Sequence, residues 1–420
     1  MVNMNKDLIK QVIIENHEFI NKVELIEREL FIENEGNYVF VGSRRAGKTY
    51  CIFQIIKNLI RTGTPIERIL YINFEDERLL ELKLEDLNLI IDCFKELFNT
   101  TPIVFLDEIQ IIIGWEKFGR RLADSGYRIF ITGSNATMLS KEIATTLGGR
   151  FLIKEIFPFT FPEYLKANNL ELENNWEFSS QRFEIRKQFD TYFYFGGFPE
   201  ILKFKEKRMW LDNLYQKIFY GDLIARYKIR NDFALKLLIK KMAESLHDEV
   251  SFNRIKNIIQ STGTKIGTAT VVEYTSYLEE SWLVFGIKNY LAKISERETS
   301  KKYYFIDNGI LSLFLQHPET ILLENIVACK LKQLFGNQLY YIRSQVEVDF
   351  YIPTTKTLIQ VSYNIDNFET ENREIESLIK VNETIAAENL LIITLDHEKV
   401  ITRNSVEIKV VPVWKWLLKS

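Results

Sequence analysis

The residues best suited to chemistry in this sequence form a phosphate-binding loop near its amino end. Gly42–Thr49 reads GSRRAGKT and satisfies the complete pattern G-x-x-x-x-G-K-[S/T], which binds nucleotide phosphates when a strand precedes it and a helix follows. Its glycines let backbone N–H groups surround the phosphates, and the helix N-terminus adds positive potential. We expect Lys48 to reach the β- and γ-phosphates and Thr49 to help hold Mg²⁺.

A nucleoside triphosphate and Mg²⁺ are therefore the expected ligands of this segment. The expected nucleotide contacts are the loop and the residue after it: Gly42, Ser43, Arg44, Arg45, Ala46, Gly47, Lys48, Thr49 and Tyr50. The alternative is an ordinary glycine-containing turn that leads into a helix, which the complete pattern disfavours.

A pair of carboxylates supplies the second half of the expected site. Ile103–Leu106 is an apolar run typical of a buried strand, and Asp107 and Glu108 follow it directly. Ligands bind at the carboxyl ends of strands in α/β sheets, so both side chains are expected at the nucleotide. We expect Asp107 to anchor Mg²⁺ and Glu108 to act as a general base toward water.

Three further polar residues are candidates for the same site, each with a plainer alternative. Ser134 and Asn135 follow the strand expected at Arg128–Thr132, where either side chain would orient the water or contact the γ-phosphate. The alternative is that one of them caps the next helix. Arg150 follows two glycines and would serve as an arginine finger toward a neighbouring subunit, or else as a structural partner of an acidic residue.

The elements that must position these residues alternate along the amino-terminal part of the chain. Helical spacing of apolar residues predicts one or two helices in residues 6–33. The predicted strands are Tyr38–Val41, Ile69–Phe74, Ile103–Leu106, Arg128–Thr132 and Arg150–Ile156, and the predicted helices are Lys48–Arg61, Leu79–Phe98, Trp115–Ser125 and Ala136–Leu147. Strands that alternate with helices predict a parallel sheet covered on both faces.

From Pro158 onward the pattern changes to long helices with few strands. Helices are predicted at Phe161–Ala167, Ser180–Tyr194 and Leu211–Lys228, and a compact three-helix pattern runs from Phe233 to Glu280. Later helices are expected at Glu324–Leu334 and Glu371–Asn382, with extended runs at Leu283–Tyr290, Tyr303–Ile306, Leu339–Ile342, Val346–Ile352, Thr357–Tyr363 and Leu390–Leu395. Boundaries are therefore expected near residues 157, 230 and 320.

The composition excludes several classes of protein. The chain has 420 residues, 46% of them hydrophobic and 26% charged, which is typical of a globular rather than a disordered protein. Lys and Arg total 54 against 57 Asp and Glu, so a strongly basic nucleic-acid coat is excluded. Three scattered cysteines exclude a disulfide framework. Since we find neither a targeting signal nor a membrane-spanning run, we expect a cytoplasmic protein without a membrane partner.

Taken together, the motifs resemble a known family. The segments that carry the resemblance are the phosphate loop, Phe105–Gln110, Thr132–Asn135, Gly149-Arg150, Pro158-Phe159, Glu163–Leu165, Gly196–Glu200, Tyr303–Asn308, Leu323–Asn325 and Glu347–Phe350. They are similar to prokaryotic AAA-type ATPases of the archaeal-ATPase and STAND-like branch, whose C-terminal domain of unknown function resembles a restriction endonuclease. The resemblance covers nearly the whole chain.

The resemblance implies an α/β fold with several appended parts. Residues 1–157 would form a P-loop NTPase core of AAA type with a parallel sheet and N-terminal helices. A helical lid (158–230), a winged-helix-like domain (231–320) and a nuclease-like α/β domain (321–420) would follow. In related ATPases a Gly-x-Pro element lies beside the adenine, which would give Gly197 and Pro199 that role; the alternative is a tight turn between helices. The preference for ATP over GTP also comes from the resemblance.

The winged-helix candidate leaves DNA binding open. Its expected recognition helix carries Glu273, Glu279 and Glu280 but no basic residue, so carboxylates would face the DNA phosphates. Basic residues on the other segments remain for backbone contacts: Lys236, Lys240, Lys241, Arg254, Lys256 and Lys265. We favour packing against another domain over DNA binding.

The nuclease-like part is expected to be inactive. The restriction-type layout uses a helix Glu, a strand Asp and a strand that ends in Glu-x-Lys, and here Glu324 and Asp349 match the first two places. The third place reads Gln360-Val361-Ser362 and lacks both the acid and the lysine. A neutral amide binds a divalent metal far more weakly than a carboxylate. A replacement cation would have to come from Lys356, Arg373 or Lys380.

The residues therefore predict an ATP-binding, Mg²⁺-dependent ATPase, whose turnover need not be fast. Its nucleotide state would drive or switch a conformational change of the appended domains. The alternative is a slow nucleotide-dependent switch that binds DNA or a protein partner. A metal-dependent nuclease is disfavoured by Gln360 and Ser362. An arginine finger would act between copies of the chain, so a homo-oligomer is one expected state.

Overall fold

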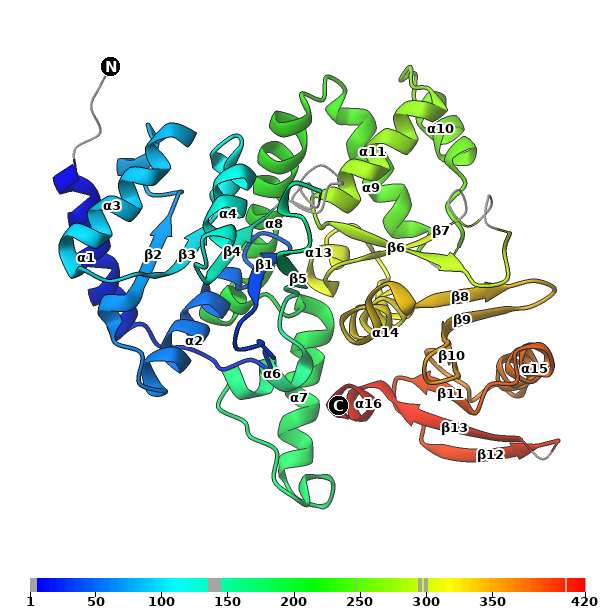
Figure 1. Ribbon diagram of the computed structural model, residues 1–420. Helices are drawn as coiled ribbons and strands as arrows, with labels where there is room; N and C mark the ends of the chain where they lie inside the picture. Colours follow the sequence, from blue (N-terminus) through cyan, green and yellow to red (C-terminus); the bar gives the residue numbers. More distant parts are fainter. Residues whose placement is uncertain are drawn as a thin grey trace. The chain divides into compact units, whose positions relative to one another are not determined.

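Apolar segments of the amino-terminal part pair into one parallel sheet. The computed structural model describes residues 6–134, 145–246, 248–293, 297, 301–404 and 406–419, and it divides into two units, Met1–Phe157 and Pro158–Ser420 (Figure 1). The strands of the first unit are β1 (Asn37–Val41), β2 (Ile69–Asn73), β3 (Ile103–Asp107), β4 (Ile129–Gly133) and β5 (Phe151–Glu155). Their order is β2-β3-β4-β1-β5, and β3 and β4 are buried along their whole length, as in a sheet covered on both faces.

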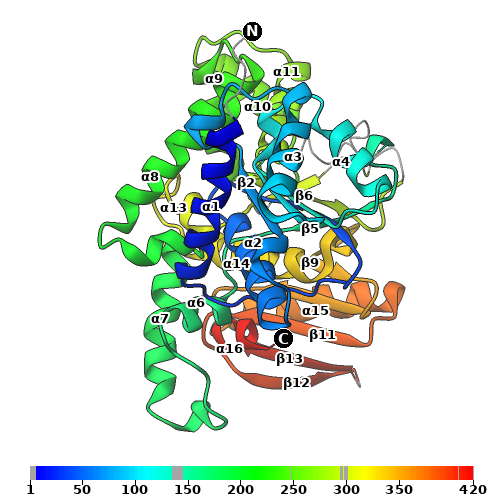
Figure 2. The same cartoon turned by 60° about the vertical axis from the view of Figure 1, so that its left-hand side comes forward.

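Helices precede and connect these strands within the described residues. They are α1 (Lys6–Lys22), α2 (Lys48–Arg61), α3 (Leu87–Phe98) and α4 (Trp115–Asp124), with 3-10 turns at Ile66–Arg68, Glu77–Leu79, Leu84–Asp86 and Ile109–Ile111. Helix α1 lies against β2 and α3 on the side that comes forward in Figure 2. Because β4 lies between β1 and β3, the segments that follow these three strands meet at the carboxyl end of the sheet.

An aromatic ladder holds the centre of this sheet together. The register aligns Phe130 of β4 with Phe105 of β3 and with Tyr38 of β1. The rings of Phe105 and Phe130 stack with centroids 4.7 Å apart, and the Tyr38 ring lies 5.9 Å from that of Phe130. Offset aromatic stacking and near-complete burial therefore stabilise the strands that carry the phosphate loop and the acidic pair.

Two predicted helices of this unit differ from the observed structure, and a third lies mostly outside the described residues. Residues 23–32 are not helical; they form an extended segment in which the backbone N–H and C=O of Arg28 bond to the Gln54 side chain. The predicted helix Leu79–Phe98 begins only at Leu87, because the preceding residues form two short turns, the first of which is capped by Asp76. Most of the predicted helix Ala136–Leu147 lies outside the described residues. Tertiary hydrogen bonds override helical spacing in the first case.

The second unit begins with helices. They are α6 (Phe161–Ala167), α7 (Gln181–Phe195), α8 (Lys207–Lys217), α9 (Asp232–Glu244), α10 (Phe252–Ser261) and α11 (Thr268–Glu280), with 3-10 turns at Trp176–Phe178 and Pro199–Lys203. Helix α8 continues as a π-helix over Ile218–Ala225, where the sequence predicts one regular helix. Later helices are α13 (Asn308–Ser312), α14 (Glu319–Phe335), α15 (Phe368–Ile385) and α16 (Val413–Leu418).

One eight-stranded sheet spans the rest of this unit. Its strands are β6 (Val284–Asn289), β7 (Lys301–Phe305), β8 (Tyr340–Arg343), β9 (Glu347–Ile352), β10 (Thr357–Val361), β11 (Asn389–Thr394), β12 (Lys399–Arg403) and β13 (Val406–Pro412). Their order is β12-β13-β11-β10-β9-β8-β6-β7, so the β6–β7 hairpin continues the sheet of the carboxyl-terminal strands. The sequence pattern did not predict β12 and β13. Among the described residues, no helix is long and apolar enough to cross a membrane.

The aromatic ladder generates a stability prediction. We expect Phe130→Ala to lower the free energy of unfolding of the first unit by about 3–5 kcal/mol, because the substitution leaves a cavity between three strands. Chemical denaturation measures this loss. Phe31, whose side chain is 73% exposed, supplies the matched control, and Phe31→Ala is expected to cost about 0.5 kcal/mol or less. Equal losses in the two variants would show that the ladder is not the centre of the core.

Candidate functional site

The loop between β1 and α2 has a backbone that requires glycine at its first and sixth positions. Gly42 has φ 152°, and a Cβ atom there would lie 2.1 Å from the carbonyl oxygen of Ile156. Gly47 caps α2 with φ 98°, a left-handed conformation that other residues rarely adopt. The two glycines thus let the loop bend directly into the N-terminus of α2, the end of a helix that favours anions.

The lysine of the loop is held inside the loop. Lys48 is 4% exposed, and its ammonium donates to the carbonyls of Gly42 (3.2 Å) and Ser43 (3.0 Å). It also lies 3.7 Å from Oε1 of Glu108. The hydroxyl of Ser43 is buried and has no hydrogen-bond partner among the described residues. A buried donor without a partner and a buried ammonium fit a position where phosphate oxygens bind.

Asp107 ends β3 and collects three hydroxyl groups. Thr49 of α2 donates to its Oδ2 at 2.8 Å, Tyr71 of β2 donates to the same oxygen at 2.9 Å, and Thr132 of β4 donates to Oδ1. Burial, with a smaller contribution from the neighbouring Glu108, raises the pKa of Asp107, whereas the hydrogen bonds from the three hydroxyls oppose that rise.

This arrangement fits a hard divalent cation. The three hydroxyl partners of Asp107 are neutral, so they leave the negative charge of a buried carboxylate uncompensated. The Thr49 hydroxyl and the Asp107 carboxylate are oxygen groups of the kind that Mg²⁺ binds, directly or through water. The residues present therefore fit Mg²⁺ beside the phosphate loop.

Glu108 follows Asp107 in a left-handed backbone conformation with φ 53°. Its N–H donates to Thr132 Oγ1 at 2.9 Å, which holds this conformation. Its Oε2 accepts hydrogen bonds from the side-chain amide of Gln110 and from the backbone N–H of Ser134 at 3.3 Å. The side chain thus lies between the lysine of the loop and the segment after β4, where a water molecule attacking the γ-phosphate would need a base.

The sequence-predicted residues of the first unit differ in how the structure places them. Ser134 is buried and contacts Glu108 through its N–H, whereas Asn135 lies outside the described residues. Arg44 pairs with Glu75 at 3.4 Å, and Tyr50 is exposed on α2. Arg150 forms an ion pair with Asp124, as its structural alternative requires; its role as an arginine finger stays a prediction.

Sequence reasoning missed four residues that the structure brings to this site. Tyr71 and Thr132 donate to Asp107, and Gln110 donates to Glu108. Arg28 donates to the carbonyl of Ala46 in the loop at 3.1 Å. Thr132 was recognisable as a polar residue near the end of an apolar strand. The contacts of the other three depend on register and chain path, which spacing alone does not give.

Gly197 and Pro199 belong to the second unit, where they form a tight turn. The N–H of Gly197 donates to Oδ2 of Asp307 at 2.7 Å, its carbonyl accepts from Phe159, and a Cβ on it would lie 2.3 Å from the Phe159 carbonyl. Pro199 opens the 3-10 turn that follows. These contacts agree with the alternative interpretation, in which Gly197 and Pro199 form a tight turn between helices. A contact of these residues with adenine stays a prediction.

The three carboxylates of the expected recognition helix are engaged inside the second unit. Glu273 accepts from Tyr277, Glu280 accepts from Tyr227, and Glu279 pairs with Lys301 of β7 at 3.4 Å. Helix α11 is therefore tied by one carboxylate to the hairpin that would form the wing. This contact agrees with packing between parts of the chain, while DNA binding stays a prediction.

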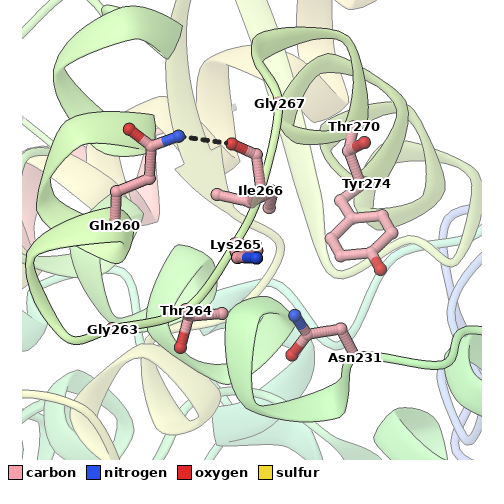
Figure 3. A pocket seen from close by; sticks show the side chains of 9 residues that line it. All are labelled: Asn231, Gln260, Gly263, Thr264, Lys265, Ile266, Gly267, Thr270 and Tyr274. Carbon is pink, nitrogen blue, oxygen red and sulfur yellow. Dashed lines mark hydrogen bonds between the residues drawn. The ribbon is translucent and has the colours of Figure 1, made fainter.

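A pocket of about 550 Å³ lies beside the turn between α10 and α11 (Figure 3). Gln260 donates to the carbonyl of Ile266 at 2.8 Å across the turn, and Thr270 and Tyr274 line the pocket from α11. Lys265 is the one basic residue among the residues that line the pocket, and they include no carboxylate. The residues that line the pocket therefore carry a single positive charge, and they form no cluster of basic side chains such as a DNA backbone requires.

The predicted nuclease-like residues also meet in the second unit. Glu324 on α14 and Asp349 on β9 face the same buried ammonium, that of Lys302 on β7. Gln360 accepts from the N–H of Asp349 at 3.3 Å, and Lys356 pairs with Glu388 instead of entering the site. Lys302 is the cation that sequence reasoning did not find, because it comes from a strand outside the expected layout.

Two protein-family models match parts of this chain. Residues 34–165 match the model of an AAA domain, and residues 186–320 match a domain of unknown function, DUF8612. The first match contains the loop and the acidic pair described above. It therefore supports nucleotide binding by this part of the chain.

Two relatives are similar over most of the chain. The uncharacterized protein MJ1544 of Methanocaldococcus jannaschii is 36% identical over 98% of this chain and 96% of its own length. An uncharacterized protein of Haemophilus influenzae is 32% identical over 65% of this chain and 67% of its own length. Both similarities extend well beyond the AAA domain.

Similarity to solved structures is more distant. The Walker-type ATPase paby2304 of Pyrococcus abyssi matches 74% of this chain and 96% of its own with 14% identity and a TM-score of 0.39. AMPPCP-bound DnaA from Aquifex aeolicus matches 67% of this chain and 89% of its own with 16% identity and a TM-score of 0.27.

The buried carboxylate beneath the Gly197 turn generates a pH prediction. Burial raises the pKa of Asp307 from its ordinary 3.8 to about 6, although backbone N–H groups of Gly197, Gly309 and Ile310 oppose this. Between pH 3.8 and about 6, Asp307 therefore keeps its proton in the folded state and releases it in the unfolded state. We expect the free energy of unfolding to fall as pH rises through this window, by up to about 3 kcal/mol from this group.

Denaturant unfolding at pH 4 and pH 7 measures this dependence. Asp307→Asn is expected to be less stable than wild type at pH 4, because it loses one acceptor, and to lose less stability between the two pH values. The exposed Asp248 supplies the control, and Asp248→Asn is expected to keep the wild-type dependence. An unchanged pH dependence in Asp307→Asn would contradict the assignment.

Proposed function

The chain belongs to the same family as the Methanocaldococcus jannaschii protein MJ1544, and on this premise we propose that it binds ATP with Mg²⁺ and hydrolyses it. The observation that carries the proposal is the pairing of the phosphate loop with the acidic end of β3. Thr49 lies 2.8 Å from Asp107, and Lys48 lies 3.7 Å from Glu108. The AAA-domain match over residues 34–165 supports the same function.

The loop residues bind and orient the triphosphate in this proposal. Backbone N–H groups from Gly42 to Thr49 surround the phosphates, and Lys48 exchanges its two carbonyl contacts for phosphate oxygens. Thr49 and Asp107 would hold Mg²⁺, which would supply positive charge beside the phosphate oxygens. Hydrogen bonds from Tyr71 and Thr132 support this role, because they hold the Asp107 carboxylate in place.

Glu108 is the proposed general base. Its carboxylate accepts a proton from the attacking water. Before that step, the carboxylate either gives up its hydrogen bond from Gln110 or accepts from Gln110 and the water together. Ser134, which already donates its N–H to this carboxylate, orients the same water or the γ-phosphate. Asn135 is the second candidate for that role. Arg150 would act on the nucleotide of a second copy, after it leaves Asp124.

We further propose that nucleotide binding and hydrolysis drive a conformational change of the second unit. The helical part after Pro158 would act as a lid, with Gly197 and Pro199 near the adenine, and the winged-helix-like and nuclease-like parts would respond to it. A slow switch that binds DNA or a protein partner is the second candidate. The engaged state of Glu108, which is bound by Gln110 and Ser134, favours slow turnover.

Substitution of the proposed base tests the hydrolysis. We expect Glu108→Gln to lower kcat for ATP by about 100-fold or more while calorimetry still detects binding of Mg·ATP, because the amide cannot accept the proton. Glu67 lies in the turn before β2, at the opposite end of the sheet, and Glu67→Gln is expected to retain wild-type kcat. Steady-state phosphate release measures both.

The same assay separates the two candidates. Negligible turnover in both wild type and Glu108→Gln, with intact nucleotide binding, would favour the switch over the ATPase. If Mg·ATP produced no heat with the wild-type chain, both candidates would be wrong.

A further inference from the structure

A lysine is buried among carboxylates in the second unit. The side chain of Lys302, on β7, is 1% exposed. Its Nζ lies 3.8 Å from Oε1 of Glu324 on α14 and 3.7 Å from Oδ1 of Asp349 on β9, and it pairs with Glu347 at the start of the same strand. Glu324 and Asp349 are themselves buried, whereas the Glu347 side chain is 30% exposed.

Contacts around this cluster hold the two buried carboxylates in place. Tyr304 donates its hydroxyl to Oε1 of Glu324 at 2.8 Å, and the backbone N–H of Val361 donates to Oδ2 of Asp349 at 2.8 Å. The rings of Tyr304 on β7 and Phe350 on β9 lie 5.6 Å apart, so aromatic side chains of the two strands pack together beside the cluster. In Asp349 the oxygen nearest Lys302 is Oδ1, which is not the one bonded to Val361, whereas in Glu324 the same Oε1 accepts from Tyr304 and lies nearest Lys302.

The charges of this cluster require a cation. Two adjacent buried carboxylates repel one another and are costly to ionise, and burial together with Glu324 raises the pKa of Asp349 to about 7, against the effect of Lys302. Burial disfavours the charge on Lys302, but Glu324, Asp349 and Glu347 outweigh it and raise its pKa above the ordinary value. The ammonium therefore provides the charge that the carboxylates need.

The position of the ammonium is that of a bound ion. Its separations from Glu324 and Asp349 exceed hydrogen-bond lengths, so it acts on these two groups as a central point charge. One carboxylate from a helix and one from a neighbouring strand, both directed at a shared point, are oxygen ligands of the kind that divalent cations bind. Among the described residues, no group of three or more His, Cys, Asp or Glu side chains is arranged to hold a metal, and this cluster, with the ammonium at its centre, is no exception.

We propose that Glu324 and Asp349 form a latent divalent-cation site whose position the ammonium group of Lys302 occupies. The C-terminal part of the chain then binds no metal, and Lys302 takes over the structural part of the role that a metal would have. The burial of both carboxylates also keeps a phosphodiester away from them. This inference concerns the second unit alone and does not depend on ATP hydrolysis by the first.

Removal of the ammonium tests the proposal in the nucleotide-free full-length chain. Lys302→Met keeps an unbranched side chain without the charge. We expect its melting temperature to lie about 10 °C below that of wild type, because a buried charge pair is broken. Addition of MnCl₂ is expected to restore most of the loss. Electron paramagnetic resonance should detect one more bound Mn²⁺ per chain than in wild type.

Lys330 offers a matched control on α14. Its ammonium is also largely buried, but it donates to the carbonyls of Trp416 (2.9 Å) and Leu417 (3.1 Å), and burial lowers its pKa to about 8. Lys330→Met is expected to lose stability without any gain from Mn²⁺. The double variant Lys302→Met/Asp349→Asn is expected to fold without Mn²⁺ and to show no additional bound ion, which keeps the test informative if the single variant fails to fold.

Two results would overturn the proposal. One is a Lys302→Met chain that binds no more Mn²⁺ than wild type. The other is a wild-type chain that already binds Mn²⁺ at a site removed by Asp349→Asn, because the ammonium would then not exclude the metal. The phosphate loop is common to all these variants, so any Mn²⁺ that it binds cancels in the comparison.

Discussion

The buried carboxylate of Asp107 is the group on which the candidate nucleotide site depends. Its oxygens accept hydroxyl groups from α2, β2 and β4, so one side chain connects the helix after the phosphate loop with both strands beside β3. The hydroxyl of Thr132 also accepts the N–H of Glu108, which places the proposed base in its left-handed conformation. Because all three partners are neutral, the site keeps a negative charge that suits a divalent cation.

The second unit meets a similar electrostatic requirement in another way. Glu324 and Asp349 are buried as Asp107 is, but the chain supplies its own cation, Lys302, from the β6–β7 hairpin. This hairpin continues the sheet of the carboxyl-terminal strands and also contacts α11 through Lys301 and Glu279. The helices before it and the strands after it are therefore joined through one structural element. Buried charge therefore acts between these segments in addition to apolar packing.

Much of the first unit was predictable because its signals are local. Apolar runs located the strands to within a few residues, and the phosphate loop together with the Asp-Glu pair identified the end of the sheet where the site forms. The predictions failed where long-range hydrogen bonds compete with local pattern, as in residues 23–32, which bond to Gln54 instead of forming a helix. The roles of Tyr71 and Gln110 could not be predicted, since they depend on strand register and on the turn after β3.

The sequence by itself determined the glycine-lysine-threonine loop, the acidic pair after an apolar strand and the presence of Gln360 and Ser362 in place of an acid and a lysine. Each of these patterns lies within a few consecutive residues. The local backbone conformation fixes how such residues lie relative to one another, so the pattern can be interpreted without knowledge of the rest of the chain. Only the tertiary structure decided that Tyr71 and Thr132 bind Asp107, that Arg150 pairs with Asp124 and that Lys302 lies between Glu324 and Asp349. Each of these contacts joins segments that are far apart in the sequence. Hydrogen bonds and Coulomb interactions depend on the distance between atoms in space, and the spacing of residues along the chain does not give that distance.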